Sequence, residues 1–250
     1  MKLTLCPSVK ILNSPSVRDY YVCSDIHGNV DALTSQLKQA GFNPNMDRLV
    51  CTGNIADRGN QSKEAALLLR EDWFESVYGN HEEMLLNTLA LGLKSSFHMN
   101  NGGRWLLDLN QVEIHLIESL YKNLPYVIEI QHKGFKYGIV HADVLGNDWD
   151  GFKNILLAHG GIRSWLYNAY HQTDVHKHAI WSRERFYNIH QDMKKINGVD
   201  AVFFGHNIAP RPLRKENMFF IDTGAYISGK ITVIKLDPVN LEVIGQPTLY

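Results

Sequence analysis

A strand, a polar loop and a helix follow one another three times between residues 20 and 90, and this repetition limits the possible folds more than any other feature. Each unit starts with a short run of β-branched or aromatic residues and ends with apolar residues at helical spacing. The runs are 20–23, 48–51 and 74–78, and the polar motifs after them are 25–28, 53–59 and 79–82. Three such units predict βαβαβ connections on a largely parallel sheet, and so an α/β fold.

The rest of the chain predicts further elements and one domain. A helix is expected over 112–121, ahead of a β-hairpin that turns at Lys133 and Gly134. The strands expected there and later are 126–131, 136–140, 200–204, 218–221, 230–236 and 241–244. Residues 1–18 lack periodicity and are interpreted as an N-terminal arm, 19–250 as a single domain, and 144–180 as an insertion above the site.

Composition argues for an ordinary globular protein. Of 250 residues, 44% are hydrophobic and 20% charged, and the formal net charge is -1, so neither nucleic acid nor an anionic membrane is expected as a partner. No run approaches the roughly 20 apolar residues of a membrane span. Three cysteines are too few for a disulfide framework, and together with the lack of a convincing signal peptide they predict a cytoplasmic protein.

Several of the polar motifs carry side chains that bind metals. Asp25 and His27 are two residues apart, so on an extended segment both side chains would point the same way and could hold one cation. Alone, such a pair is more often a solvated turn or a helix cap, and a lone histidine such as His141 or His206 is more often a core residue. Together the motifs favour a metal site, because each candidate follows an apolar strand, and the ends of strands bring residues that are distant in sequence to one edge of a sheet.

One carboxylate, one carboxamide oxygen and three imidazoles, with a bridging position between them, suit a pair of divalent first-row metals better than a cysteine-rich structural zinc site. Two metals about 3.5 to 4 Å apart polarise a phosphoryl oxygen and generate hydroxide at neutral pH, which predicts phosphoester hydrolysis. The candidate ligands are Asp25, His27, Asn54, Asn80, His141 and His206. The histidines outside the motifs, His98 among them, are interpreted as structural or surface residues.

Six motifs in this order resemble those of the metallo-dependent phosphoprotein phosphatases, and most of all the compact bacterial and phage branch. The pattern of that family is GDxHG, GDxxDRG, GNHE, HAD or HAG, a tryptophan-flanked arginine, and GH. The corresponding segments here are 24–28, 53–59, 79–82, 141–143, 181–185 and 205–207. Segments 101–103 and 221–225 also resemble that branch, and the likeness covers roughly residues 20–236.

The resemblance implies a calcineurin-like metallophosphatase fold, a four-layer αββα sandwich of two mixed β-sheets with the site on strand-end loops. It implies a serine/threonine protein phosphatase, extending to tyrosine, that acts by direct attack of a metal-bound water or hydroxide on a phosphomonoester. Two divalent ions would be the cofactors, manganese first, with iron and zinc, nickel or cobalt as alternatives. Phosphorylated proteins or peptides would be the partners, with no obligate regulatory subunit.

The resemblance also implies a role for each matching residue. Asp25 and His27 would hold the first metal, position 54 would bridge both, and Asn80, His141 and His206 would hold the second. Arg58 and Arg183 would clamp the phosphate, which Asn80 also contacts, and His81, oriented by Asp57, would be the general acid. The structural alternatives are an Arg58–Asp57 pair, an Arg183–Glu184 pair on a surface helix, and Asp222 as a turn residue.

Asn54 departs from the family pattern, which has aspartate there. Its neutral amide offers one carbonyl oxygen and an NH2 group that cannot face a metal, so weaker metal occupancy and a large fall in turnover are expected. Either the chain is a natural divergent member, or the aspartate was replaced on purpose to hold substrate without cleaving it.

Three other functions remain open. A symmetrical dinucleoside tetraphosphatase shares the framework, but typically has GNHD and lacks the Asp-Arg-Gly ending present at 57–59. A phosphoprotein-binding module with a decayed metal site is supported only by Asn54. An α/β domain with purely structural histidines is the third.

Overall fold

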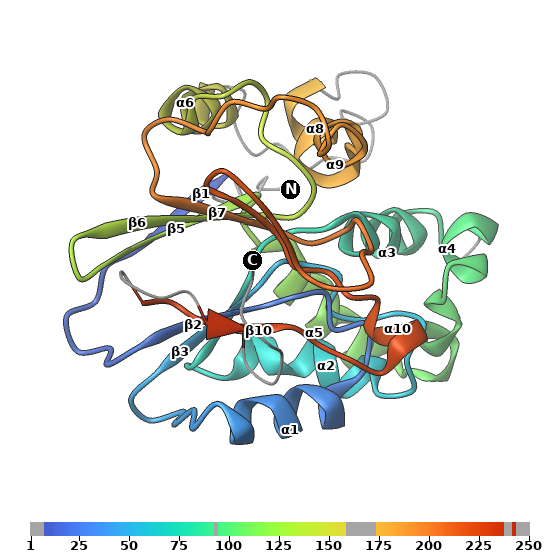
Figure 1. Ribbon diagram of the computed structural model, residues 1–250. Helices are drawn as coiled ribbons and strands as arrows, with labels where there is room; N and C mark the ends of the chain where they lie inside the picture. Colours follow the sequence, from blue (N-terminus) through green and yellow to red (C-terminus); the bar gives the residue numbers. More distant parts are fainter. Residues whose placement is uncertain (1–7, 93–94, 159–173, 238–241, 244–250) are drawn as a thin grey trace.

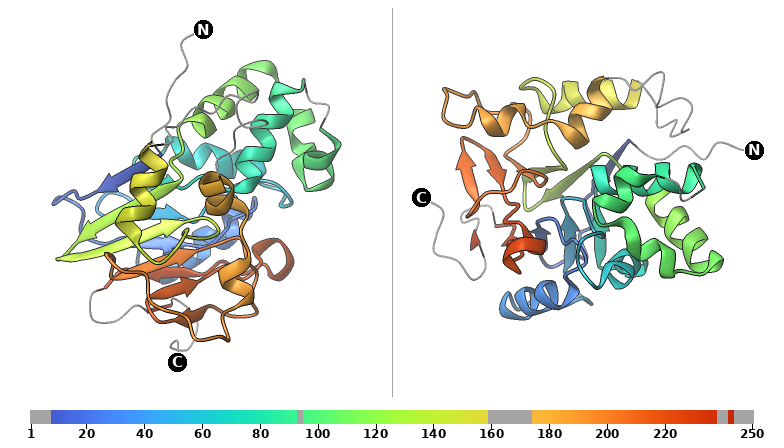
Figure 2. Two further views of the ribbon diagram at one scale, coloured as in Figure 1. Left: turned by 90° about the horizontal axis from the view of Figure 1, so that it is seen from above. Right: turned by 90° about the vertical axis from the view of Figure 1, so that its right-hand side faces the viewer.

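Two β-sheets face each other between two layers of helices (Figures 1 and 2). The computed structural model of the chain describes residues 8–92, 95–158, 174–237 and 242–243. Both sheets mix parallel and antiparallel strands, which confirms the predicted four-layer αββα sandwich. None of the helices in these ranges is long and apolar enough to cross a bilayer.

The five-stranded sheet contains the three repeated units. Its order is β11-β10-β2-β3-β4, in which β2, β3 and β4 are parallel and β10 is antiparallel to β2. Its strands are β2 (Tyr20–Cys23), β3 (Arg48–Cys51), β4 (Phe74–Ser76), β10 (Val233–Lys235) and β11 (Glu242–Val243). The helices of the units are α1 (Val30–Gln39), α2 (Ser62–Leu67) with the 3₁₀ turn η1 (Leu68–Arg70), and α3 (Asn80–Ala90).

The six-stranded sheet has the order β1-β5-β6-β7-β9-β8. Its strands are β1 (Val9–Leu12), β5 (Val127–His132), β6 (Phe135–Val140), β7 (Ala201–Phe204), β8 (Leu213–Lys215) and β9 (Met218–Phe220). Strands β6, β7 and β9 are mutually parallel, while β5 and β8 are antiparallel to their neighbours β6 and β9. Three parallel strands in each sheet therefore end toward the loops that carry the polar motifs.

Helices cover the outer faces of both sheets. In Figure 1, α1, α2 and α5 lie below the five-stranded sheet, and α6, α8 and α9 lie above the six-stranded one. The helices not yet bounded are α4 (Ser96–Asn100), the 3₁₀ helix η2 (Gly103–Asp108), α5 (Gln111–Lys122), α6 (Trp149–Ala158), α8 (Asp174–Trp181), α9 (Glu184–Tyr187) and α10 (Ala225–Ser228).

The core between the sheets follows from alternation along buried strands. In β2, Tyr20 and Val22 belong to the cluster between the sheets, whereas Tyr21 and Cys23 face the helices. Strand β7 divides in the same way, with Phe203 inside and Phe204 outside. Because both faces of these strands are covered, their sequences are apolar throughout.

Most predicted elements are present. The hairpin is confirmed: β5 and β6 pair antiparallel around Lys133 and Gly134, both with positive φ as a two-residue turn requires. Gly41, with φ 66°, follows the C-cap of α1 as expected. The predicted strands 230–236 and 241–244 are shorter, at Val233–Lys235 and Glu242–Val243.

One expectation about the chain's organisation differs from the structure. Within the segment expected to be an N-terminal arm, 1–18, residues 9–12 form β1 and pair parallel with β5. For the expected insertion at 144–180, the buried Trp149 and Phe152 of α6 belong to the core, and 159–173 lies outside the described residues. The position of that whole segment over the site remains a prediction.

Candidate metal and phosphate site

The ten residues predicted for the site converge on one pocket of about 220 Å³. Seven of these residues line the pocket. Each of the other three forms a hydrogen bond with a lining residue. The lining residues among the ten are His27, Asn54, Arg58, Asn80, His81, Arg183 and His206. The supporting pairs are Asp25 with Asn54, Asp57 with His81, and His141 with Asn80.

Asp25 is buried and accepts hydrogen bonds from three directions. Its donors are Thr52 Oγ1 at 3.0 Å, Asn54 Nδ2 at 3.0 Å and the His206 amide at 3.2 Å. The last contact requires glycine at position 205, because a Cβ there would stand 2.1 Å from Asp25 Oδ1. The Asp25–His27 segment is not extended as expected: His27 has φ 47°, so the backbone turns left-handed between the two side chains.

Asn80, His141 and His206 form a second group. His141 Nδ1 lies 2.7 Å from the carbonyl of Thr52 and must donate its proton there, which leaves Nε2 with a lone pair. That lone pair faces Asn80 Oδ1, a second acceptor, at 2.9 Å. Two acceptors this close repel each other. The contact becomes favourable if a cation lies between them, or if the Asn80 amide is rotated by 180° so that its nitrogen faces His141. Within the described part of the chain, His206 Nε2 is also buried without a hydrogen-bond partner.

The imidazoles are in the protonation state that binds metals. Burial lowers the pKa of His141 to about 3 and that of His206 to about 2, and burial also lowers the pKa of His27. His27 Nδ1 lies 3.1 Å from the carbonyl of Ala56, so Nε2 carries the lone pair, which Arg58 Nη1 approaches at 3.4 Å. All three rings are therefore neutral at pH 7, and each keeps a lone pair that could bind a metal.

The two metal positions fit the side chains unequally. Two donors bound to one cation at about 2.1 Å each stand roughly 3 Å apart, which matches the Asn80–His141 separation of 2.9 Å. At the first position the Asn54 amide donates to Asp25 and occupies an oxygen that a metal would need. No group of three or more His, Cys, Asp or Glu side chains among the described residues is arranged to hold a metal, and the candidate set relies on two asparagines.

His81 and Asp57 form the predicted pair. His81 Nδ1 lies 2.6 Å from Asp57 Oδ2, so Nε2 of the ring is directed away from the carboxylate, and the residue lines the pocket. Burial alone would raise the pKa of Asp57, but hydrogen bonds from His81 and His98 hold it below its usual value. The ionised carboxylate therefore fixes the ring with a proton on Nδ1.

Arg58 and Arg183 are open to the pocket. Neither forms an ion pair within the described ranges, so the structural alternatives to phosphate binding, pairs with Asp57 and with Glu184, do not occur. The guanidinium of Arg58 stacks 4.2 Å from the centre of the Tyr226 ring. Arg183 donates to Asn207 Oδ1 at 3.0 Å. Both guanidinium groups retain N–H donors that could bind an anion.

The sequence also matches a family model, calcineurin-like phosphoesterase, over residues 19–210. The chain belongs to the calcineurin-like phosphoesterases. Serine/threonine-protein phosphatase 2 of Escherichia coli (strain K12) is 32% identical over 229 residues, 90% of this chain and 96% of that protein. A symmetrical bis(5'-nucleosyl)-tetraphosphatase of Actinobacillus pleuropneumoniae serotype 3 is 27% identical over 171 residues, 64% of this chain and 61% of that protein.

Solved structures agree on the fold. A serine/threonine protein phosphatase from Saccharomyces cerevisiae superposes with a TM-score of 0.67 at 16% identity, covering 98% of this chain and 86% of that one. The family generally uses a dimetal centre, and of the two positions described above the group of Asn80, His141 and His206 fits a cation better.

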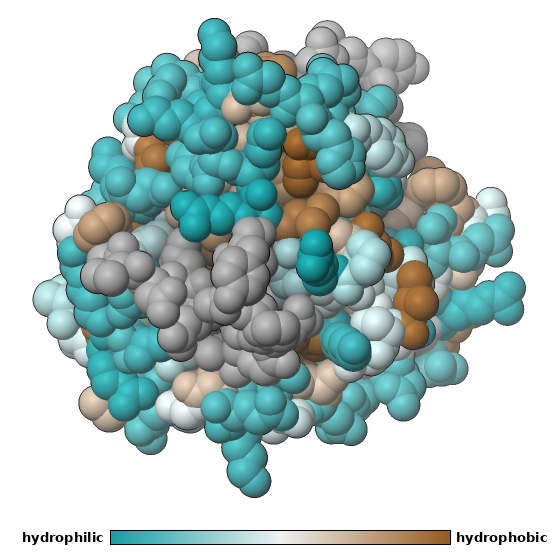
Figure 3. Space-filling model, in the orientation of Figure 1, coloured by the Kyte–Doolittle hydropathy of each residue, from teal (hydrophilic) through white to brown (hydrophobic). Residues whose placement is uncertain are grey.

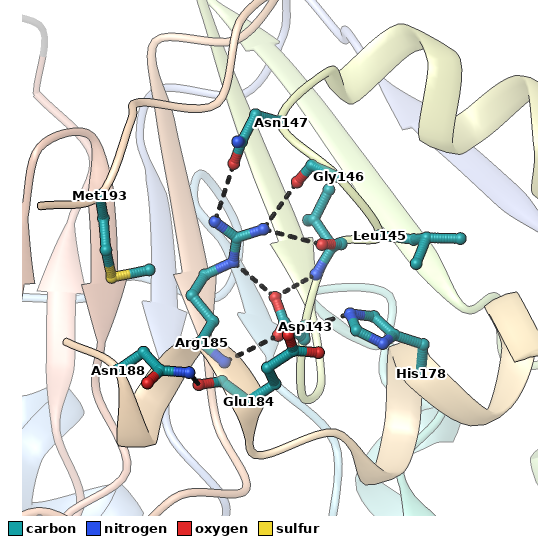
Figure 4. A pocket seen from close by; sticks show the side chains of 10 residues that line it. Asp143, Leu145, Gly146, Asn147, His178, Glu184, Arg185, Asn188 and Met193 are labelled. Atoms are coloured by element: carbon teal, nitrogen blue, oxygen red, sulfur yellow. Dashed lines mark hydrogen bonds and ion pairs between the residues drawn. The ribbon is translucent and has the colours of Figure 1, made fainter. Parts of the chain in front are cut away.

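A buried ion pair anchors the part of this phosphoesterase that carries Arg183. Figure 4 shows Arg185 held by Asp143 at 2.6 Å, by Asn147 at 3.0 Å and by the carbonyl of Gly146 at 2.6 Å. The sequence placed Asp143 in a motif but gave Arg185 no role. Because Arg183 is the N-cap of the short helix α9, these contacts fix the position from which its side chain reaches the pocket.

An apolar rim surrounds the mouth of the pocket. Phe186, Tyr187, Ile208 and Tyr226 line it, and Tyr187 is 68% exposed. In Figure 3, brown and tan side chains gather right of centre, between the helices α8 and α9 above and α10 at the lower right. Only the proximity of Tyr226 to the 221–225 motif offered a sequence signal for this rim.

Sequence reasoning missed further residues in and beneath the candidate site. His98, interpreted as structural or surface, is buried and bonds to Asp57 at 2.8 Å, and Trp105 donates to the same carboxylate at 2.7 Å. Asp222, weighed as a turn residue, lines the pocket, and burial raises its pKa to about 6. The backbone gives one more signal of function, because five site residues adopt positive φ. They are His27, Asn54, Asp57, Arg58 and His206.

Proposed function

We propose that this phosphoesterase is a metal-dependent protein phosphatase acting on phosphoserine and phosphothreonine, and on phosphotyrosine as well. The main supporting observation is that Arg58, Arg183 and His81 open onto one pocket, and that no carboxylate in the described part of the chain pairs with either arginine. Relatives that bear the name serine/threonine-protein phosphatase align over nearly the whole chain. Phosphorylated proteins or peptides are accordingly the proposed partners.

Each side chain has a part in the proposed reaction. Two divalent ions, when bound, would neutralise phosphate charge and supply the attacking water at neutral pH. Asn80, His141 and His206 would hold one ion; Asp25, His27 and Asn54 would contact the other. Arg58 and Arg183 would bind the phosphate oxygens, whose negative charge is greatest in the transition state. His81, in its doubly protonated form, would pass the Nε2 proton to the leaving oxygen as the P–O bond breaks, while Asp57 keeps hold of its Nδ1–H. The proton lost by the attacking water would restore that form.

Asn54 is proposed to impair this reaction. Its Nδ2 group donates to Asp25 at 3.0 Å, so the side chain neither adds negative charge between two cations nor leaves Asp25 free for one. We therefore expect weak occupancy of the Asp25–His27 position and slow turnover. Phosphate binding by the two arginines does not depend on that charge and is expected to persist.

Restoring aspartate tests this account. Asn54→Asp should raise manganese-dependent hydrolysis of p-nitrophenyl phosphate at least about 10- to 100-fold, because residues that only support metal ligands already change activity on that scale. Asn45→Asp is the matched control, since it makes the same chemical change at an exposed turn before β3, away from the strand ends that carry the site. Equal rates for Asn54→Asp and the parent chain would refute the role given to position 54.

The substrate class needs a second comparison on Asn54→Asp. Faster turnover of phosphoserine peptides than of dinucleoside tetraphosphates supports the protein phosphatase. The reverse order would make the chain a tetraphosphatase, as the more distant relative is named. Tight phosphopeptide binding without turnover, even after the replacement, would make it a binding module.

We also propose manganese as the native metal and the cytoplasm as the location. Cys23 and Cys51 are free buried thiols, which suits a reducing compartment. Counting and identifying the ions in the purified chain tests the first proposal: two manganese ions in Asn54→Asp support it, and another metal overturns it.

A further inference from the structure

The carboxylate of Asp57 accepts hydrogen bonds from three side chains, of which sequence reasoning supplied only His81. His98 Nε2 lies 2.8 Å from Oδ2, the oxygen that also faces His81, and Trp105 Nε1 lies 2.7 Å from Oδ1. The far nitrogen of His98 meets Thr88 Oγ1 at 3.1 Å. Asp57 and His98 are almost completely buried, so these donors are fixed by packing.

Both additional donors belong to the segment 98–105, which contains the Asn-Gly-Gly motif. Its second glycine, Gly103, lies so close to the ring of His98 that a Cβ there would be 2.4 Å away. Its first glycine, Gly102, has φ 102°, and a Cβ there would be 2.4 Å from the backbone nitrogen of Arg58. Neither position tolerates a side chain. The two glycines of the motif therefore allow this segment to pack closely against both Asp57 and Arg58.

Three donors determine the plane of the Asp57 carboxylate. A carboxylate held by one histidine can still rotate about its Cβ–Cγ bond. With the indole N–H on Oδ1 and a second imidazole on Oδ2, rotation would break two further hydrogen bonds to a charged group, which are stronger than those between neutral groups. The lone pair of Oδ2 that meets His81 Nδ1 consequently keeps one direction.

We propose that His98 and Trp105 are positioning residues, which hold the Asp57 carboxylate so that His81 faces the oxygen of the leaving group. The inference rests on the proposed function, in which His81 Nε2 gives a proton to that oxygen as the P–O bond breaks. Neither residue touches substrate. They act through Asp57, and a misdirected His81 leaves the alkoxide unprotonated.

Dependence on the leaving group separates this role from general structural support. A p-nitrophenolate ion leaves readily without a proton, whereas the alkoxide of serine does not. General acid catalysis contributes about 10²- to 10⁴-fold, and almost all of that matters only for the poor leaving group. Loss of positioning should therefore slow phosphoserine peptides far more than p-nitrophenyl phosphate, with little change in KM.

Trp105→Phe in the Asn54→Asp background is the direct test. It removes one N–H and keeps an aromatic ring at a half-buried position. We expect kcat to fall about tenfold or more for a phosphoserine peptide, against less than about threefold for p-nitrophenyl phosphate, a modest share of the general acid contribution. Trp149→Phe is the matched control, because it removes an indole bond to Glu129 away from the pocket. Equal losses for both substrates, or no loss, would overturn the proposal.

A second pair of variants tests His98, which is fully buried. His98→Gln keeps an N–H donor and should retain the ratio of the two rates better than His98→Leu, which keeps only bulk. If both variants lower the rates for the two substrates by the same factor, His98 serves the fold alone and its part of the proposal fails.

Proton NMR of the chain with Asn54 separates this inference from the proposed function. The short His81–Asp57 hydrogen bond should give a low-field Nδ1–H signal, which we expect to shift in Trp105→Phe and to stay in place in Trp149→Phe. An unmoved signal in Trp105→Phe would overturn the positioning role. Absence of any phosphatase activity in Asn54→Asp, with that signal shifted in Trp105→Phe, would instead refute only the proposed function.

Discussion

Replacing Asn54 by aspartate should destabilise the metal-free chain, and one distance gives the size of the effect. Asn54 Nδ2 donates to Asp25 Oδ2 at 3.0 Å, and both residues are buried. Aspartate has nearly the same shape, so it would place a second carboxylate oxygen at that distance. An attraction of donor and acceptor thus becomes a contact between two like charges.

The repulsion can be estimated from Coulomb's law. Two unit charges 3.0 Å apart at an effective dielectric constant of about 20 repel by roughly 5.5 kcal/mol. Sharing a proton avoids this. Holding a proton on a carboxyl group at pH 7 costs about 4 kcal/mol from a usual pKa near 3.9, and less for Asp25, because burial already raises its pKa. The smaller figure limits the loss, so we expect about 2–4 kcal/mol. In a domain of this size that corresponds to a Tm lowered by roughly 4–16 °C.

Thermal unfolding with EDTA and with excess manganese measures both halves of the prediction. Without metal, Asn54→Asp should unfold below the parent chain. Manganese at 100 times its Kd adds about 2.7 kcal/mol for each site, so it should raise the Tm of Asn54→Asp more than that of the parent. Asn45→Asp should follow the parent under both conditions. Equal metal-free stability, or equal shifts with manganese, would refute the electrostatic reasoning.

Three further changes have defined outcomes. Arg185→Gln should free the segment that carries Arg183 and weaken inhibition of the phosphatase reaction by inorganic phosphate several-fold. It should also lower stability, because Asp143 loses its cation, whereas Arg214→Gln, at an exposed position, should change neither. Glu129 has a pKa held below its usual value: burial opposes this, and hydrogen bonds from Lys153 and others prevail. Its stabilisation is therefore complete above about pH 4.3 and lost as pH falls through the lower folded pKa, so Glu129→Gln should flatten the acid limb of urea unfolding curves recorded against pH. Phe203→Ala, between the sheets, should cost about 3–5 kcal/mol in denaturant unfolding.

Local patterns predicted the elements whose neighbours are close in sequence. The repeated units gave β2, β3 and β4 with their helices, and the turn at Lys133 and Gly134 gave the hairpin. Strand β1 was missed because its four residues show no alternation and their partner is β5, more than 100 residues later. Residues close to Val9–Leu12 in the sequence therefore do not indicate the pairing that makes this segment a strand.

The site was predicted as a set of residue types, and its geometry was not. Strand ends indicated where Asp25, Asn80 and His141 would meet, but not that His27 would sit in a left-handed turn. Nor could spacing show that His98 would lie against Asp57, since a buried histidine in a short helix has no periodic signature. Contacts between loops depend on packing that a single chain pattern does not determine.

The division of the site between the two sheets has a consequence for the order of folding. Asp25, Asn54 and Asn80 follow strands of one sheet, while His141 and His206 follow strands of the other. Each sheet can form its own ladders before the two meet, but neither alone presents a complete cage for a cation. Binding energy that appears only after docking slows unfolding and leaves the early refolding phase unchanged. In a stopped-flow refolding experiment, the first kinetic phase whose rate changes when a divalent ion is added would thus be the phase in which the two sheets join.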